Sequence, residues 1–225
     1  MHQGRVDYEG EGLTEEELLD SPYAQARRWV DEAVARAQSA SDVFEPLAMS
    51  VATVDADCRP NVRTVLMRFL DERGPGFVTS LTSTKGHEIL VNPAVSASLT
   101  WPAMYRAIRF RGHAVALEDS EVEGYFESRP WASRISAWAS QQSEPVASRA
   151  VLEQQYARRA TQFPDRGDPA DVPVPDFWGG YRIVADEVEF WAGRRNRLHD
   201  RLVFTREGEG DLGDAESWAV HRRQP

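Results

Sequence analysis

The first periodic segment of the chain has the spacing of an amphipathic helix. Ser21-Pro22 marks its start, because serine caps a helix N-terminus and proline fits the first turn. Apolar residues then recur at helical spacing as far as about residue 37, and they are Ala26, Trp29, Val30, Ala33 and Ala37. The pattern therefore predicts a helix over residues 22–37 that buries one side.

After this helix, alternating apolar and polar positions predict strands, separated by turn residues and a few helices. The predicted strands cover residues 47–54, 61–70, 76–80, 95–101, 106–117, 180–183, 188–191, 202–205 and 217–221. The predicted helices between them cover residues 83–92, 120–129, 132–139 and 148–163. A parallel doubly wound sheet would need regular strand–helix alternation, which is missing. We expect an α+β, mainly β fold built on an antiparallel barrel.

Composition does not alter the expected fold, but it limits the kinds of partner and the cellular location that we expect. The chain has 225 residues, a formal net charge of −10 and one cysteine, Cys58. The charge argues against a nucleic-acid partner, and the lone cysteine argues against a disulfide or a multi-cysteine metal site, so we expect no metal. Neither a membrane-length apolar run nor a secretory signal is present, so we expect a cytoplasmic protein with no membrane partner. Residues 1–20 are predicted to be a mobile arm and residues 21–225 a single domain.

Positive charge is concentrated where an anion could bind. Lys85 is the only lysine, and it follows hydroxyl residues at the start of a predicted helix, where free N–H groups and the helix dipole favour an anion. Tyr125 and Arg129 share one face of a predicted helix, and Ser133 follows four residues later. A tyrosine, an arginine and a serine that converge would suit a phosphate monoester. The alternatives are an ordinary helix cap and a solvated helix face.

Two further arginine-containing segments are ambiguous when taken alone. Arg63 and Arg68 are five residues apart in one predicted strand, so they would point to opposite faces of a flat strand. They are either solvated charges at strand ends or ligands of a buried anion. Residues 194–201 are rich in arginine and contain His199. An exposed basic loop would explain their charge, but it would not explain the aromatic strand before them.

Taken together and in this order, these clusters resemble the pyridoxamine 5′-phosphate oxidase family, which has the FMN-binding split-barrel fold. The resemblance runs from about residue 45 to residue 225. Its most specific motifs are Phe177-Trp178-Gly179-Gly180-Tyr181-Arg182, Glu189-Phe190-Trp191 and Arg197-Leu198-His199-Asp200-Arg201. The N-terminal Arg5-Val6-Asp7-Tyr8 is similar to the family's arm, which closes over substrate. The fold implied is an antiparallel FMN-binding split β-barrel with flanking helices.

The resemblance also implies a homodimer with FMN at the subunit interface and a small phosphorylated pyridine as substrate. The implied FMN contacts are Arg63, Val65, Leu66, Arg68, Val78, Thr79, Thr84, Lys85, Gln142, Ser143, Trp191 and Arg201. The implied substrate contacts are Arg5, Tyr8, Arg68, Tyr125, Arg129, Ser133, Arg197 and His199. Of these, Arg197 and His199 would lie against the pyridine ring as the catalytic residues.

The implied reaction oxidises pyridoxamine or pyridoxine 5′-phosphate at C4′, with a hydride passed to FMN and O2 reduced to H2O2. The chain departs from the family pattern at three positions: Arg68 stands for a usual lysine, Thr84 for a common arginine and Ala107 for a glutamine that touches the flavin. Two alternatives therefore stay open. One is a related FMN-dependent oxidase of specialised metabolism, similar to the phenazine-pathway members, with a different substrate. The other is a non-catalytic protein that binds flavin or pyridoxal phosphate.

Overall fold

The computed structural model describes residues 8–225, and within them nine strands form one antiparallel sheet. The strands are β1 (Ala48–Val54), β2 (Pro60–Leu66), β3 (Phe69–Asp71), β4 (Gly74–Ser80), β5 (Ala94–Trp101), β6 (Arg106–Ala116), β7 (Trp178–Ala192), β8 (Asp200–Arg206) and β9 (Trp218–Arg222). Their order is β2-β1-β5-β6-β7-β4-β3, with β8 paired to β7 and β9 paired to β8. The α-helices are α1 (Pro22–Ser39), α2 (Thr84–Val91), α3 (Asp119–Ser128), α4 (Trp131–Ala139) and α5 (Arg149–Gln162).

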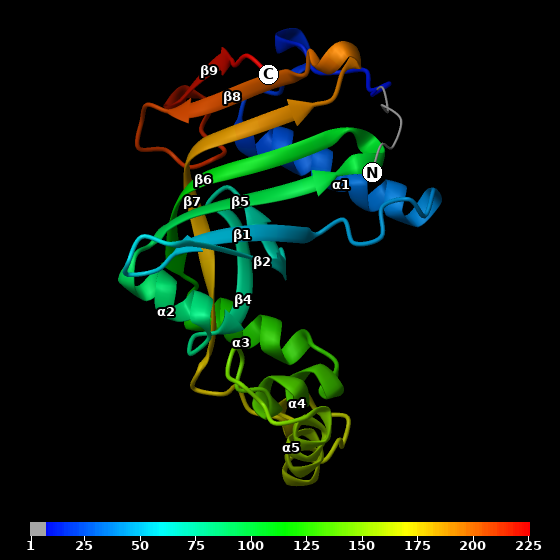
Figure 1. The fold of residues 1–225 in the computed structure, drawn as a ribbon, viewed down its shortest axis with the longest axis vertical. Coiled ribbons are helices and arrows are strands. Elements are labelled where there is room, and N and C mark those ends of the chain that lie inside the picture. The colour runs from blue at the N-terminus through cyan, green and yellow to red at the C-terminus, as the bar shows by residue number, and fades with distance from the viewer. Residues whose placement is uncertain (1–7) are drawn as a thin grey trace.

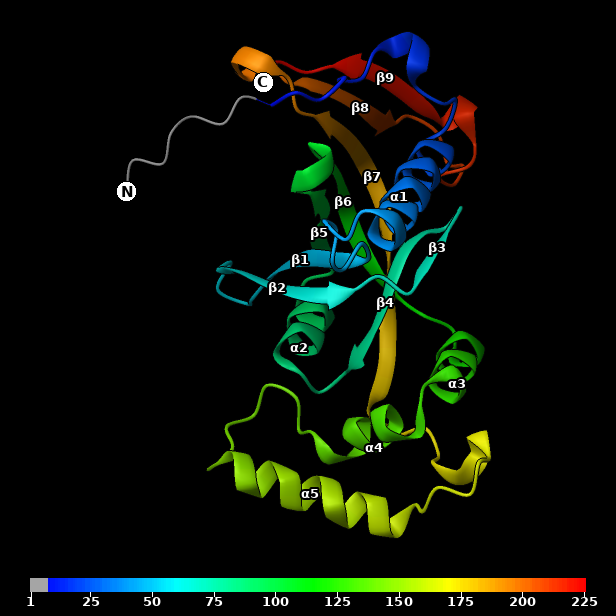
Figure 2. The same ribbon diagram turned by 90° about the vertical axis from the view of Figure 1, so that its right-hand side faces the viewer.

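Strand β7 connects the two ends of the molecule. One edge of it pairs with β6 over most of its length, and the other edge pairs with β4 near its start and with β8 near its end. Figures 1 and 2 show β7 along the long axis, with β8 and β9 at one end and helices α3 to α5 at the other. Because β4 and β8 share one edge of β7, the sheet curls into a barrel that is split between them.

The main core fills the barrel and continues under α1. Phe77, Phe110 and Phe190 come from β4, β6 and β7, and all three are fully buried. Trp29 of α1 is 1% exposed and meets the Phe190 ring edge-on, with 5.4 Å between the centroids. The Ser21 hydroxyl caps α1 by accepting a hydrogen bond from the Ala24 N–H. The helix predicted from Ser21-Pro22 and its buried apolar stripe are therefore confirmed.

A smaller apolar cluster holds the helical end together. Phe126 of α3 and Ile135 of α4 are fully buried in it. The Trp138 indole N–H donates to the carbonyl of Pro173 at 2.7 Å, which ties α4 to the loop before β7. Helix α5 packs against α4 but has no buried residue. In Figure 1, α4 and α5 project below the barrel. This helical end therefore has an apolar cluster of its own, apart from the barrel core.

Two predicted strand boundaries were wrong. The strands predicted at 180–183 and 188–191 are one strand, because polar Asp186 between them forms a bulge opposite β6 and does not turn the chain. The strand predicted at 61–70 is two strands, because the chain leaves the β2 ladder after Leu66 and the Arg68 N–H bonds instead to the carbonyl of Gly76 on β4. The expected antiparallel, mainly β fold with flanking helices is confirmed.

The described part of the N-terminal segment runs beside the loop that follows β7. Leu13 is 3% exposed, and its backbone N–H donates to the Asp200 carboxylate at 3.0 Å. Gly10 lies so close to the carbonyl oxygen of Gly193 that a Cβ atom would overlap it. The predicted arm covers residues 1–20, of which residues 1–7, including Arg5, lie outside the described residues. None of the helices within residues 8–225 has the length and apolar character to cross a membrane. The cytoplasmic location stays a prediction.

Candidate active site

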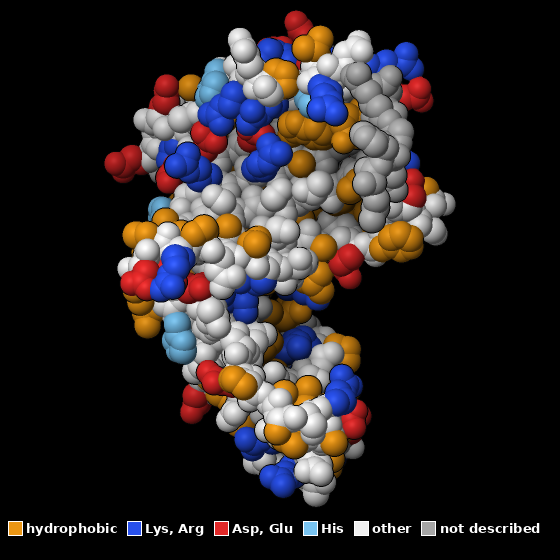
Figure 3. All heavy atoms as spheres, in the orientation of Figure 1, with side chains coloured by type: hydrophobic (Ala, Val, Ile, Leu, Met, Phe, Trp, Pro, Cys, Tyr) orange, Lys and Arg blue, Asp and Glu red, His pale blue; other side chains and the backbone are white. Residues whose placement is uncertain are grey.

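A cavity of about 500 Å³ opens between the barrel and the helical end. Its lining is Arg63, Thr64, Val65, Leu66, Arg68, Val78, Thr79, Lys85, Tyr125, Arg129, Gln142 and Trp178. Figure 3 shows basic side chains in the hollow between the barrel and the projecting helices. The described lining holds four cationic residues and no carboxylate, although the chain as a whole carries a net charge of −10. Such a cavity favours an anionic ligand.

Lys85, on the first turn of α2, is the buried cation at the base of this cavity. The Ser83 hydroxyl caps the helix by accepting from the Gly86 N–H. The Lys85 ammonium donates to the Thr79 hydroxyl at 3.1 Å and to the Gln142 side-chain oxygen at 2.8 Å. Burial, with the nearby charge of Arg63, lowers the pKa of Lys85 to about 8. A bound phosphate would restore this pKa, because it supplies the anion that the ammonium lacks.

Arg63, on β2, is held from behind by a buried carboxylate. One of its nitrogens donates to Glu88 Oε2 at 2.8 Å, and another donates to the Thr53 hydroxyl at 2.5 Å. Burial alone would raise the pKa of Glu88, but hydrogen bonds from Asn61 and Thr53 and the charge of Arg63 hold it below its ordinary value. Glu88 therefore stays ionised and fixes the guanidinium at the cavity wall.

Arg129 directly follows α3 and stacks on an aromatic ring inside the cavity. Its guanidinium carbon lies 4.6 Å from the centroid of the Trp178 ring. Its Nη1 atom is buried and has no hydrogen-bond partner among the described residues. Burial lowers the pKa of Arg129, and the nearby positive charge of Arg68 lowers it further. Arg129 and Arg68 line the cavity together, and its described lining holds no carboxylate, so this part of the cavity favours an anionic ligand.

The break after β2 brings Arg68 to the same cavity as Arg63. On a flat strand the two would face opposite sides, but Arg68 lies beyond the end of the ladder, so both line one wall. The Arg68 guanidinium carbon lies 5.8 Å from the centroid of the Tyr125 ring. Tyr125 and Arg129, predicted to share a helical face, do line the cavity together. Arg63 is half-buried and paired with Glu88, so it is not a solvated strand-end charge. Arg68 is exposed and follows the end of β2, so its role as an anion ligand stays a prediction.

Three predicted contacts lie beside the cavity and do not line it. Thr84 and Ser143 bond to one another, because the Thr84 backbone N–H donates to the Ser143 hydroxyl at 3.2 Å. This bond joins the start of α2 to the loop that carries Gln142. Ser133 is half-buried on α4, one turn beyond Arg129.

A second group of predicted residues lies at the far end of β7. His199 packs on Trp191, with 4.7 Å between the ring centroids, and Tyr8 packs on His199 at 5.3 Å. His199 Nδ1 accepts a hydrogen bond from the Arg194 backbone N–H at 3.0 Å. The neutral imidazole must therefore carry its proton on Nε2. Burial and then the charge of Arg197 lower the pKa of His199 below its ordinary value.

Arg197 is held in a backbone conformation that arginine seldom adopts. Asn196 and Arg197 both have positive φ, of 58° and 63°. Two successive left-handed residues without glycine cost on the order of 1–3 kcal/mol each. The turn places exposed Arg197 two residues before His199. Strain of this kind is common at functional sites, which agrees with the sequence-based role of Arg197.

Asp200 fixes the base of this loop. It accepts hydrogen bonds from the Leu13 N–H at 3.0 Å and from Arg222 at 2.5 Å, and it forms a further ion pair with Arg194. Burial opposes the ionised form, but these donors hold the pKa of Asp200 below its ordinary value. The Asp200 carboxylate therefore links three parts of the chain by hydrogen bonds: the N-terminal segment, the loop after β7, and β9.

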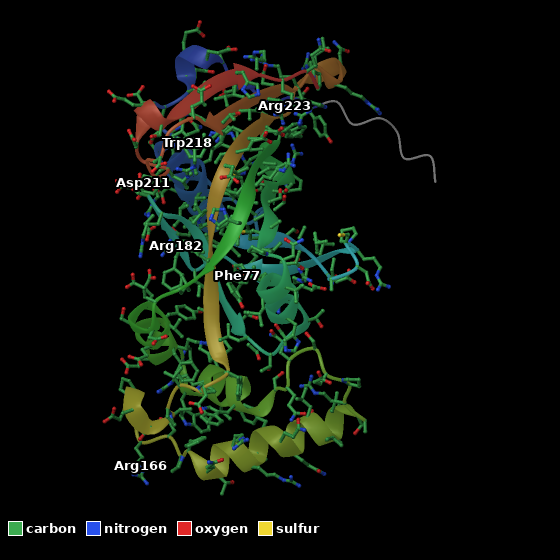
Figure 4. All side chains as sticks on the ribbon, turned by 90° about the vertical axis from the view of Figure 1, so that its left-hand side faces the viewer. Phe77, Arg166, Arg182, Asp211, Trp218 and Arg223 are labelled. Carbon is green, nitrogen blue, oxygen red and sulfur yellow. The ribbon has the colours of Figure 1, made fainter. Side chains whose placement is uncertain are left out.

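The structure thus divides the predicted site into two groups. Trp178, at the start of β7, lines the cavity, and Trp191 lies thirteen residues further along the same continuous strand. That separation is roughly 40 Å along the strand. In Figure 4, Phe77 of β4 and Arg182 of β7 lie between the projecting helices and the end of the molecule where Arg223 lies. One chain therefore brings the cavity residues together, and brings Trp191, His199 and Tyr8 together, but does not join the two groups.

Sequence reasoning missed the residues that support the site from behind. Trp178 lies under Arg129, and it belonged to a motif already noted without a role. Glu88 carries no local signal, because its partner Arg63 is 25 residues away in sequence.

Comparisons with known proteins match most of the chain to one family. Residues 36–163 match the family model described as pyridoxamine 5′-phosphate oxidase. Residues 178–225 match the one described as pyridoxine 5′-phosphate oxidase C-terminal dimerisation region. The chain is 43% identical over 222 residues to the pyridoxine/pyridoxamine 5′-phosphate oxidase of Kineococcus radiotolerans, covering 98% of this chain and 97% of that protein. It is 42% identical over 222 residues to the protein of that name in Psychrobacter sp., with the same coverage.

Solved structures give the same answer for the fold. PhzG from Burkholderia lata 383, solved in complex with tetrahydrophenazine-1-carboxylic acid, superposes with a TM-score of 0.82 at 29% identity, over 96% of this chain and 99% of that one. A pyridoxamine 5′-phosphate oxidase-related, FMN-binding protein from Nostoc punctiforme superposes with a TM-score of 0.67 at 17% identity, over 88% and 97% of the two chains. Because both family models match and the relatives align over nearly the whole sequence, the chain belongs to the pyridoxamine 5′-phosphate oxidase family.

Proposed function

We propose that this chain is an FMN-dependent oxidase that forms pyridoxal 5′-phosphate. Pyridoxine 5′-phosphate and O2 give the aldehyde and H2O2, and pyridoxamine 5′-phosphate with O2 and water gives the aldehyde, ammonia and H2O2. The observation that carries the proposal is the cavity lined by four cations and no carboxylate among its described residues. The Arg129 Nη1 atom in it is buried and has no partner within residues 8–225, and an anionic ligand would supply the acceptor.

The cavity has room for two phosphate groups on separate cations. Arg63 and Lys85, with Gln142, would hold the FMN phosphate beside the first turn of α2. Arg68 and Arg129 would hold the substrate phosphate at the end of α3, with the Tyr125 hydroxyl as a donor. Ser133, one turn beyond Arg129 and outside the cavity lining, would have to turn toward the phosphate to donate as well. Charge-assisted hydrogen bonds from arginine to phosphate are strong and directional, so each anchor also orients its ligand.

The proposed site is completed by a second copy of the chain. Trp191 and Arg201 would contact FMN, and Arg197 and His199 the pyridine ring, yet all four lie at the end of β7 away from the cavity. A homodimer in which the far end of one chain covers the cavity of the other would join the two groups. The match of residues 178–225 to a dimerisation region supports this arrangement. The interface position of FMN is part of the proposal.

The chain's own residues bind and orient the substrate. Bound FMN supplies the hydride-accepting chemistry and the reaction with O2. Arg197 stays cationic and would stabilise negative charge on the substrate ring or its 3-oxygen. His199 is neutral at pH 7, and it would donate a hydrogen bond from Nε2 to the substrate. Tyr8 on the His199 ring would exclude water from above. Arg5, outside the described residues, stays a predicted substrate contact.

The test is direct. Purified protein loaded with FMN should show the absorption of an oxidised flavin, and anaerobic pyridoxamine 5′-phosphate should bleach it. In air, pyridoxal 5′-phosphate and H2O2 should form in equal amounts. If neither pyridoxamine 5′-phosphate nor pyridoxine 5′-phosphate gave any product, the proposal would be refuted. A bound flavin without turnover would favour the non-catalytic alternative.

A second candidate, an oxidase of specialised metabolism, is favoured by the likeness to PhzG, which was solved with a tricyclic carboxylic acid. The discriminating feature is the second anion site. A phosphate on the substrate needs Arg68, Tyr125 and Arg129 together, and all three line the cavity here. Inorganic phosphate should compete with a phosphorylated substrate for this site, but it should not compete with a phenazine carboxylic acid. Measuring inhibition by inorganic phosphate with each kind of substrate would separate the two candidates.

A further inference from the structure

Glu189 is a buried carboxylate in the middle of an arginine cluster on one face of the sheet. It lies on β7 and is 3% exposed. Its Oε1 atom accepts from Arg109 of β6, its Oε2 atom accepts from Arg201 of β8 at 2.5 Å, and Arg223 approaches to 3.7 Å. Figure 3 shows basic and acidic side chains mixed over the end of the molecule where β7 and β8 run. Each carboxylate oxygen thus serves a different arginine.

The same contacts fix the direction of Arg201. Its Nη2 atom donates to Glu189, and its Nη1 atom donates to the carbonyl of Gln224 at 3.0 Å. Its Nε atom is buried and has no partner among the described residues. Each Nη atom of the guanidinium is therefore held by one acceptor, while the Nε–H has no acceptor among the described residues. An arginine held in advance loses less side-chain entropy on binding a ligand than a free one.

We propose that Glu189 is a positioning residue, which holds the Arg201 guanidinium in the orientation that binds flavin. This inference rests on the proposed function, in which Arg201 is an FMN ligand. A glutamine at this position would offer one acceptor oxygen in place of two and would turn an NH2 group toward a guanidinium. Glu189→Gln should therefore release Arg201 with almost no change in side-chain volume.

Glu187 provides a matched control on the same strand. It lies two residues before Glu189, on the same face of β7, and it pairs with Arg223 at 3.1 and 2.9 Å. It makes no hydrogen bond to Arg201. Glu187→Gln therefore removes a carboxylate–arginine pair from the same cluster and leaves the contacts of Arg201 in place.

The measurement is the dissociation constant of FMN, followed by quenching of flavin fluorescence, together with the melting temperature of the FMN-free protein. Glu189→Gln should raise the dissociation constant about tenfold, as expected for one charge-assisted hydrogen bond, and Glu187→Gln should change it less than twofold. Glu189→Asp keeps the charge and should restore part of the affinity. This variant also serves if the glutamine variant does not fold.

A double-mutant cycle tests whether Glu189 acts through Arg201. In an Arg201→Gln background, adding Glu189→Gln should leave the FMN dissociation constant unchanged. Equal weakening in both backgrounds, or no weakening by Glu189→Gln alone, would overturn the inference. A wild-type protein that does not bind FMN at all would instead refute the proposed function.

Discussion

The two ends of β7 both gather cations, but they use them differently. In the cavity at the Trp178 end, neither Arg68 nor Arg129 has a carboxylate partner among the described residues. At the Trp191 end, Arg201 is paired with Glu189, and Asp200 is shared by two further arginines. Cations that lack a carboxylate partner favour an anionic ligand. Cations that are paired with a carboxylate are held in position by the protein, as Arg63 is by Glu88 at the cavity wall.

The largest expected effect is the loss of the unpaired cation. Arg129→Gln removes the only guanidinium that stacks on Trp178 within the described residues, and we expect kcat/KM for pyridoxamine 5′-phosphate to fall by about 100-fold, mostly through KM. Steady-state kinetics at saturating FMN measure this. The dissociation constant of FMN should stay the same, because the FMN phosphate is assigned to Arg63 and Lys85.

Glu127→Gln is the control for this variant, since Glu127 is an exposed residue two positions earlier on α3. It should leave kcat/KM within twofold of wild type. If Arg129→Gln and Glu127→Gln behaved alike, Arg129 would have no role in binding the substrate phosphate.

At the other end of β7 the expected effect is on stability. Asp200→Asn should lower the free energy of unfolding by about 2 kcal/mol at pH 7, because three donors lose a charged acceptor. The pKa of Asp200 is depressed in the folded state, so its contribution is full above the unfolded pKa of about 4 and is lost as pH falls through the folded value. Denaturant unfolding at pH 7 and below pH 4 measures the difference, which should shrink in acid.

Asp186→Asn is the matching control, because Asp186 is exposed at the β7 bulge. A difference between wild type and Asp200→Asn that stayed constant from pH 7 to pH 3 would contradict the ionised state assigned to Asp200.

A smaller effect is expected from the pH dependence of FMN binding. Lys85 of the free protein loses its proton near pH 8, whereas bound phosphate favours the charged form. FMN affinity should therefore be level between about pH 7 and pH 8, where the phosphate is a dianion, and fall by up to tenfold per pH unit above that range. Lys85→Arg keeps its charge throughout this range and should abolish the pH dependence. Equal slopes for the two proteins would show that Lys85 does not titrate there.

The smallest effect concerns His199. Protonation of Nδ1 would break its hydrogen bond with the Arg194 N–H, and the pKa is lowered by burial and by Arg197. We expect kcat to be level near neutral pH, with an acid limb whose midpoint lies below 6.5. His199→Asn should lose that limb while keeping a donor group. A wild-type midpoint above 6.5 would contradict a neutral His199.

The sequence predicted contacts between residues that are close together in the chain, and it did not predict contacts between residues that are far apart. Tyr125 and Arg129 could be expected to lie together, because residues four apart share one face of a helix, and both line the cavity. The fold class and α1 also followed from local periodicity. The pairs Glu189–Arg201 and Glu88–Arg63 could not be predicted, since they depend on strand register and on how α2 packs. The continuity of β7 was missed because a bulge and a turn use the same polar residues.

The continuity of β7 leads to a prediction about dimers that contain two different variant chains. If each site takes its cavity from one subunit and its Trp191 end from the other, an Arg129→Gln chain and an Arg201→Gln chain are each defective alone but complementary. In their heterodimer, one site receives both defects and the other receives none. Random reassociation of equal amounts would restore about a quarter of the wild-type sites. Two sites contained within single subunits would gain nothing from mixing, so activity recovered on mixing would show that each subunit depends on its neighbour for catalysis.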